Sequence, residues 1–162
     1  ALWLAAKTQG ELQDRAASVA GTIWLAEVAV AVVFLAASYF MTDLYANYMA
    51  NPLLFAVILL TVAALFGIRV FLAQKAFFKA WFASALTIVG ATFYGVIGLF
   101  PTMFPSSLDP AWSLTAHNAS STQLTLTIML VVVAIFVPIV LAYQAWAYNL
   151  FKGKITKEDL AY

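Results

Sequence analysis

Apolar positions dominate the chain, and the charged residues that interrupt them leave four long gaps. Each gap approaches or exceeds the about 20 apolar residues that a helix needs to cross the hydrocarbon core of a bilayer. Unpaired backbone groups are too costly in hydrocarbon for irregular structure, and the short alternating segments of a membrane barrel are absent. The pattern predicts an all-α integral membrane protein, a four-helix transmembrane bundle with spans at 22–41, 52–72, 82–100 and 124–151.

Local signals place several helix ends. Asn51 precedes a proline, which is typical of an N-cap followed by proline at the first helical position. Ser120 and Gln123 have the spacing of a capping box, so we expect the last helix to begin near Thr122. Pro138 lies in the middle of that span, where we expect a kink or tilt.

The segments outside the spans are shorter and more polar. Residues 1–21 are typical of the end of a preceding helix followed by an amphipathic cytoplasmic connection. We expect 101–123 to form an outer loop and 152–162 a cytoplasmic tail. The chain opens on ALWLAA without the basic region of a signal peptide, so we expect a fragment, a processed chain or one part of a split subunit.

Basic residues fall in alternate connections only. The loops at 42–51 and 101–123 contain no lysine or arginine, so the positive-inside rule predicts that these loops lie outside and that both termini are cytoplasmic. The residues on the predicted inner side are Lys7, Arg15, Arg69, Lys75, Lys79, Lys152, Lys154 and Lys157.

Composition agrees with a membrane protein and excludes several functions. The chain is 65% hydrophobic and 9% charged, whereas soluble proteins carry charge on roughly a quarter of their residues. A net charge of +1 gives no reason to expect a nucleic-acid partner. Without cysteine, the chain has no disulfides, thiolate metal ligands or cysteine nucleophiles.

Three stretches carry a family resemblance. They are GLFPTMFPSSLDPAWSLTAHNASS at 98–121, KTQGELQDRA at 7–16 and FVPIVLAYQAWAYNLFKGK at 136–154. Together they resemble the second half of subunit II of cytochrome bd-type quinol oxidases, bacterial terminal oxidases that reduce oxygen with electrons from quinol.

The resemblance implies a function for the chain as part of a complex. It would be a membrane subunit in the bacterial inner membrane, supporting a haem-bearing subunit I in electron transfer from quinol to O2, with cytoplasmic proton uptake and generation of a proton gradient. Haem b and haem d would lie in subunit I. Further partners would be the N-terminal half of subunit II, a small single-helix subunit, quinone and lipids.

The residues of this chain offer little for haem ligation. His117 is the only histidine and falls in the predicted outer loop, so two histidines cannot clasp a haem here. Met41 and Met129 lie in spans, where methionine usually serves packing. We therefore expect neither catalytic nor metal-ligating residues in this chain.

Glu27 is the one acidic residue well inside a predicted span, about 8 Å along the helix from Thr22. A carboxylate in a membrane is costly unless it is paired, hydrated or neutral, so it is a functional candidate. One interpretation is an entry point for the protons consumed in oxygen reduction. The alternative is an interfacial glutamate that reaches headgroup water or bonds to a neighbouring helix.

The predicted outer loop contains a second candidate site. Trp112, His117 and Asn118 could stack on a quinone ring and hydrogen-bond its carbonyl groups. The alternative is structural, because loops rich in proline, serine and asparagine satisfy their own backbone groups, with tryptophan as an interface anchor.

Other features predict packing between helices. Ala91 and Gly95 have the spacing of a small-residue contact, with Gly90 and Gly98 nearby. Two functions compete with the oxidase interpretation: half of a membrane transporter, which would place polar groups or broken helices at mid-membrane, and a non-catalytic membrane scaffold.

Overall fold

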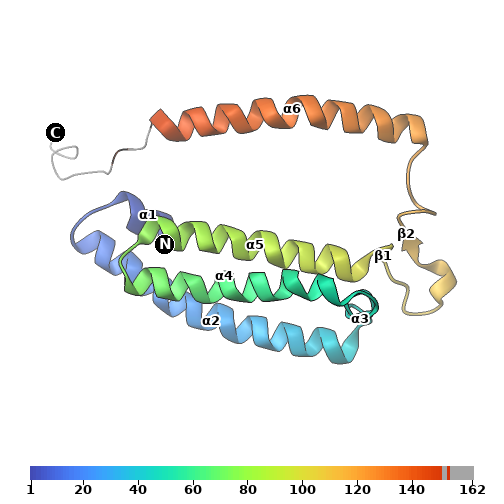
Figure 1. Cartoon of the computed structure of the whole chain (residues 1–162), viewed down its shortest axis with the longest axis horizontal. Coiled ribbons are helices and arrows are strands. Elements are labelled where there is room, and N and C mark those ends of the chain that lie inside the picture. The colour runs from blue at the N-terminus through green and yellow to red at the C-terminus, as the bar shows by residue number, and fades with distance from the viewer. Residues whose placement is uncertain (151–152, 154–162) are drawn as a thin grey trace. The chain divides into compact units, whose positions relative to one another are not determined.

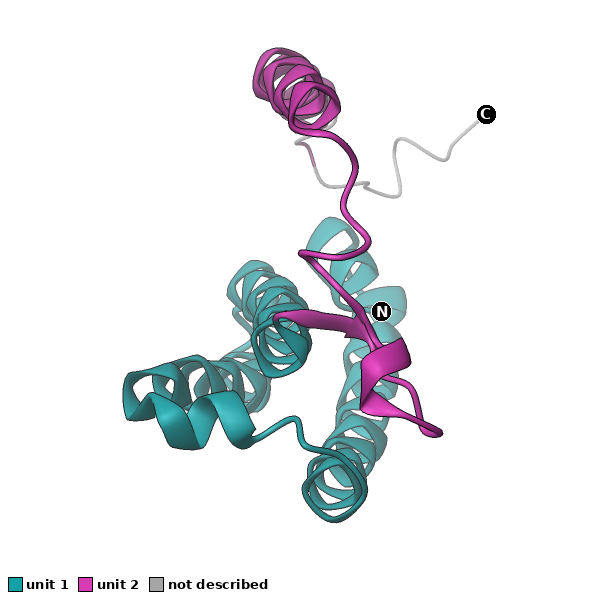
Figure 2. Ribbon diagram, turned by 90° about the vertical axis from the view of Figure 1, so that its right-hand side faces the viewer, with its two compact units in different colours: residues 1–100, 154–162 teal, residues 101–153 magenta. Residues whose placement is uncertain are grey.

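A computed structural model describes residues 1–150 and Gly153, in two units (Figures 1 and 2). The described part of the first unit is Ala1–Phe100, and the second unit is Pro101–Gly153. The predicted tail at 152–162 and its three lysines, together with Phe151 at the end of the last predicted span, lie outside the described residues, apart from Gly153.

The first unit is helical throughout. Its elements are α1 (Leu2–Lys7), α2 (Glu11–Met41), α3 (Ala46–Ala50), the 3-10 turn η1 (Pro52–Leu54), α4 (Phe55–Ala73) and α5 (Phe77–Leu99). The second unit contains β1 (Thr102–Phe104), the 3-10 turn η2 (Pro110–Trp112), β2 (Leu114–Thr115) and α6 (Gln123–Leu150).

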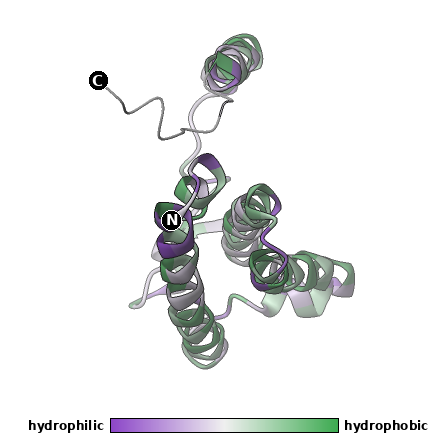
Figure 3. Cartoon of the chain, turned by 90° about the vertical axis from the view of Figure 1, so that its left-hand side faces the viewer, coloured by the Kyte–Doolittle hydropathy of each residue, from purple (hydrophilic) through white to green (hydrophobic). Residues whose placement is uncertain are grey.

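Within the residues that the structure describes, four helical segments are long and apolar enough to cross a membrane: Glu11–Met41, Pro52–Ala73, Phe77–Leu99 and Gln123–Leu150. Figure 3 shows hydrophobic residues on each of these helices. The prediction of an all-α membrane protein is confirmed, and the only strands in the described part of the chain are the short antiparallel pair β1 and β2.

Two spanning helices begin earlier than the charge pattern predicted. The helix expected from residue 22 starts at Glu11, where Gly10 turns the chain with φ of 69° and Glu11 and Asp14 occupy the first turn, a favourable place for negative charge. Similarly, α5 starts at Phe77 instead of residue 82. A charged residue marks the end of an apolar stretch in the sequence but does not end the helix, because backbone hydrogen bonding continues into the headgroup region.

Capping explains the other starts. Asn51 accepts a hydrogen bond from the Leu53 amide at 3.3 Å, as an N-cap should, but it caps η1, which leads into α4. Thr122 Oγ1 accepts from the Thr125 amide at 3.4 Å, so Thr122 caps α6 in place of Ser120. The helix α6 continues through Pro138, so this proline does not end it.

The core of the first unit lies where α4 and α5 pack together and α2 joins them. Trp24 is buried there, and its indole N–H donates to the Leu65 carbonyl at 2.8 Å, which satisfies the polar atom of a large apolar ring. The other buried members are Ala20, Leu65, Ile68, Leu72, Ala80 and Ala83.

Glycines allow the close approach of α5, as predicted, but at different positions. A Cβ at Gly90 would collide with the Thr61 side chain, and one at Gly98 would collide with Leu44. Gly95 faces open space within this unit, and Ala91 lines a cavity. The small residues predicted to make close contacts therefore lie on the right helix, but the tight contacts are made by Gly90 and Gly98 and not by Ala91 and Gly95.

Aromatic and amide side chains close the end of the unit near α3. Tyr48 is buried, and its hydroxyl donates to the Tyr94 carbonyl at 2.8 Å. Burial, with a smaller contribution from Tyr45, raises the pKa of Tyr48. Asn47 donates its side-chain amide to the carbonyl groups of Ile97, at 2.8 Å, and of Phe100. These bonds replace the helical partners that the last carbonyls of α5 lack.

Candidate functional site

Glu27 lies on α2 and lines one cavity together with Ile68 of α4 and Ser84 of α5. Ile68 is five residues from Ala73, where α4 ends, and Ser84 is seven from Phe77, where α5 begins. At 1.5 Å per residue, Ile68 and Ser84 lie about 8–10 Å from the α4–α5 turn, and Glu27 lies further from it, because Trp24, one turn earlier on α2, already bonds the Leu65 carbonyl.

The Glu27 side chain is exposed on the first unit. No described side chain forms an ion pair or a hydrogen bond with its carboxylate. In a spanning helix, such a carboxylate needs water, a proton or a partner outside this unit.

Two cavities meet at Glu27. The first, of about 310 Å³, lies toward the α4–α5 turn and is lined by Trp3, Trp81 and Ser84. The second, of about 160 Å³, is lined by residues of α2, α4 and α5, and Glu27 is the one residue that lines both.

Hydroxyl groups line the second cavity. Thr61 donates to the Val57 carbonyl at 2.7 Å, and Thr87 donates to the Ala83 carbonyl at 2.9 Å. Tyr94 follows Thr87 by seven residues on α5, and its hydroxyl lies 3.1 Å from Ser38 Oγ. A hydroxyl oxygen that donates its proton retains lone pairs, so each of these groups can accept a hydrogen bond from water in the cavity.

Sequence reasoning missed these hydroxyl groups. Thr87, Ala91 and Tyr94 recur at four- and three-residue intervals and therefore share one face of α5. That spacing was the available signal. It was weak, because a threonine in a spanning helix usually bonds its own backbone, as Thr61 and Thr87 do here.

In the second unit, the predicted quinone residues have unequal roles. Asn118 accepts a hydrogen bond from the Thr115 amide at 2.7 Å and donates one to the Ser113 carbonyl at 2.9 Å, so its side chain shapes the loop. Trp112 ends η2 and is 67% exposed, and His117 is exposed. The side-chain amide of Asn118 is therefore used within the loop, whereas the rings of Trp112 and His117 are exposed.

The candidate haem ligands that the sequence offers are His117, Met41 and Met129. His117 lies in the loop, Met41 is the last residue of α2, and Met129 lies on α6 in the other unit. No group of three or more histidine and acidic side chains gathers among the residues described.

Comparison with known proteins gives one family throughout. The family model for cytochrome bd terminal oxidase subunit II matches residues 1–151. "Cytochrome bd-I ubiquinol oxidase subunit 2" of Escherichia coli K12 is 43% identical over 81 residues, which are 50% of this chain and 21% of that protein.

Two further relatives extend the match. "Probable cytochrome oxidase subunit 2" of Haemophilus influenzae is 37% identical over 112 residues, 68% of this chain and 29% of the relative. "Cytochrome bd ubiquinol oxidase subunit 2" of Bacillus subtilis is 30% identical over 164 aligned positions, 99% of this chain and 47% of the relative. The chain spans less than half the length of each of these relatives. Since the family model covers all but the last eleven of 162 residues, the chain belongs to the cytochrome bd terminal oxidase subunit II family, as the sequence resemblance predicted.

Proposed function

We propose that this chain is the C-terminal half of subunit II in a cytochrome bd-type quinol oxidase. It would support the haem-bearing subunit I in electron transfer from quinol to O2, with cytoplasmic proton uptake and generation of a proton gradient. The observation that carries this proposal is the family match over residues 1–151 in a chain with four helices able to span a membrane. Two relatives named as ubiquinol oxidase subunits support the electron donor.

The partners follow from the same family. They are subunit I with haem b and haem d, the N-terminal half of subunit II, a small single-helix subunit, quinone and lipids. The single histidine of the chain, which lies in the loop of the second unit, supports haem in the partner. The distribution of lysine and arginine supports cytoplasmic termini, with 42–51 and 101–123 outside.

Within this complex, Glu27 would receive protons from the cytoplasmic side. Water entering the cavity beside Trp3, Trp81 and Ser84 would bring a proton to the carboxylate, which then turns toward the second cavity. The position of Glu27 between the two cavities and the lack of a pairing group among the described side chains support this role. An interfacial glutamate that only holds water remains the competing interpretation.

A quinone headgroup is the proposed ligand of the loop in the second unit. Trp112 would stack on the ring, and the His117 imidazole would donate to a quinone carbonyl. Asn118 would hold the loop in shape through Ser113 and Thr115, as its two hydrogen bonds indicate.

Purification through a tag on this chain tests the assignment to an oxidase. A mild detergent extract should yield a coloured complex with haem absorbance and quinol-dependent oxygen consumption. Colourless material without oxidase activity would contradict the proposal and favour a transporter half or a passive scaffold.

A further inference from the structure

Two adjoining cavities in the first unit lie apart from Glu27. One, of about 360 Å³, is lined by Lys75, Phe77 and Lys79 at the α4–α5 turn, together with Ala6 of α1. The other, of about 630 Å³, runs between α4 and α5. Phe78 and Lys79 line both, so the two spaces adjoin at these side chains and are together called the groove.

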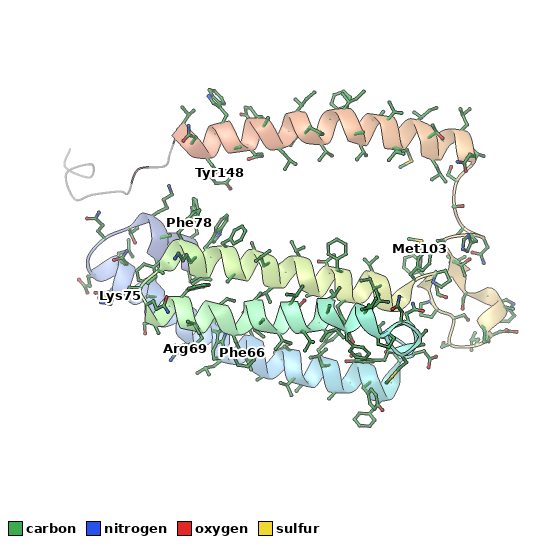
Figure 4. The ribbon with its side chains drawn as sticks, viewed as in Figure 1. Phe66, Arg69, Lys75, Phe78, Met103 and Tyr148 are labelled. Atoms are coloured by element: carbon green, nitrogen blue, oxygen red, sulfur yellow. The ribbon has the colours of Figure 1, made fainter. Side chains whose placement is uncertain are left out.

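The groove changes character along its length. At the turn, Lys75 and Lys79 are exposed, and neither ammonium group forms an ion pair with a described carboxylate. Figure 4 shows Lys75 and Phe78 at this same end of the helix pair. Beyond Lys79, the lining is apolar, with Gly67, Phe71, Phe82 and Leu86 among its residues.

The depth of the groove identifies the kind of ligand. Both helices can span a membrane, so their turn lies where water meets the bilayer. Leu86 is seven residues beyond Lys79, about 10 Å deeper along α5. A matching ligand carries negative charge at the boundary and a long apolar chain into the hydrocarbon, which is the chemistry of an anionic phospholipid.

We propose that this groove binds one anionic phospholipid. Its phosphate lies between the ammonium groups of Lys75 and Lys79, and one acyl chain lies along the apolar part past Gly67. A Cβ at Gly67 would meet Phe71 at 3.7 Å and Ala83 at 3.9 Å, ordinary contact distances, so the glycine leaves room in the groove that a longer side chain would fill.

The test uses the full chain in its membrane complex, solubilised in mild detergent and titrated with phosphatidylglycerol, with bound lipid counted by native mass spectrometry. The double variant Lys75→Gln/Lys79→Gln should weaken phosphatidylglycerol binding about thirtyfold. Each lysine near a lipid surface contributes about 1 kcal/mol, and about 1.4 kcal/mol corresponds to a tenfold change in affinity. The matched control Arg15→Gln removes an exposed cation that does not line the groove and should leave binding unchanged. Equal binding by the double variant and the wild type would overturn the proposal, as would an equal loss in Arg15→Gln.

A second variant tests the apolar part independently of charge. Gly67→Leu should release the lipid while both lysines remain, and phosphatidylcholine should bind the wild type much more weakly than phosphatidylglycerol. If Gly67→Leu instead strips a protein subunit and retains the lipid, a partner helix occupies the groove and the proposal fails. Displacement of the lipid by inorganic phosphate at equal concentration would also overturn it, since the apolar chain would then contribute nothing.

Discussion

Glu27 shows how one residue can connect two spaces in a small helical unit. Its neighbours one turn away on α2 are Trp24, which holds the core through the Leu65 carbonyl, and Ala31, which lines the second cavity. The helix therefore fixes the backbone of Glu27 on both sides. Only its side chain is left to move between the cavities.

Replacement of Glu27 by glutamine tests the proposed role of this carboxylate in proton uptake. Glutamine keeps the size and hydrogen-bonding capacity but cannot bind and release a proton, so oxygen consumption by the complex should fall about tenfold or more. Steady-state oxygen uptake measures the effect, with haem content as the check on assembly. Glu11→Gln, which changes an exposed glutamate paired with Arg15, is the matched control and should retain full activity. Unchanged turnover in Glu27→Gln would leave this glutamate as an interfacial group only.

The loop allows a separate test of quinone binding. His117→Ala removes an exposed imidazole but keeps the backbone amide of residue 117, which donates to Thr115 Oγ1 at 3.3 Å, so the fold of the loop should persist. Quinone extracted from the purified complex should fall several-fold relative to haem. Asn118→Ala should lose quinone through disruption of the loop, with an accompanying rise in protease sensitivity. Full quinone retention in His117→Ala would assign the loop a structural role alone.

At the scale of elements, hydrophobicity located all four spanning helices, and the loop sequence identified the family. Their starts were harder to predict, because Glu11 and Phe77 lie beyond the apolar gaps and are set by turn geometry at Gly10 and at the residues before α5. Long-range pairs such as Ser38 with Tyr94 could not be predicted, since they depend on how far each helix is rotated about its axis. The shared cavity position of Glu27 escaped prediction for the same reason.

Close packing of α4 and α5 gives a prediction that compares two glycines of one helix. Gly90→Ala places a methyl group against Thr61 and should destabilise the protein by about 1–3 kcal/mol through overpacking. Gly95→Ala meets open space and should stabilise α5 by about 0.5–1 kcal/mol through its better helix propensity. Thermal unfolding in detergent measures both. Equal effects from the two variants would contradict the packing described for Gly90.

On the scale of the whole molecule, the cysteine-free chain permits a direct test of membrane orientation. Ser107→Cys places a thiol in the predicted outer loop, and Gln74→Cys places one at the α4–α5 turn, both at exposed positions. In spheroplasts, whose outer membrane has been removed and whose inner membrane is intact, a membrane-impermeant maleimide should label Ser107→Cys alone. Both should react after the membrane is opened. Labelling of Gln74→Cys in intact spheroplasts would reverse the orientation derived from lysine and arginine.

The bonds from Asn47 to the end of α5 have a chemical consequence over the lifetime of the protein. The side-chain amide donates to the carbonyl groups of Ile97 and Phe100. Slow hydrolysis of that amide to an acid would replace the donor nitrogen with a second oxygen, and attraction would become repulsion at both carbonyls. Ageing by deamidation at this single position would therefore loosen the junction between a spanning helix and its extramembrane cap.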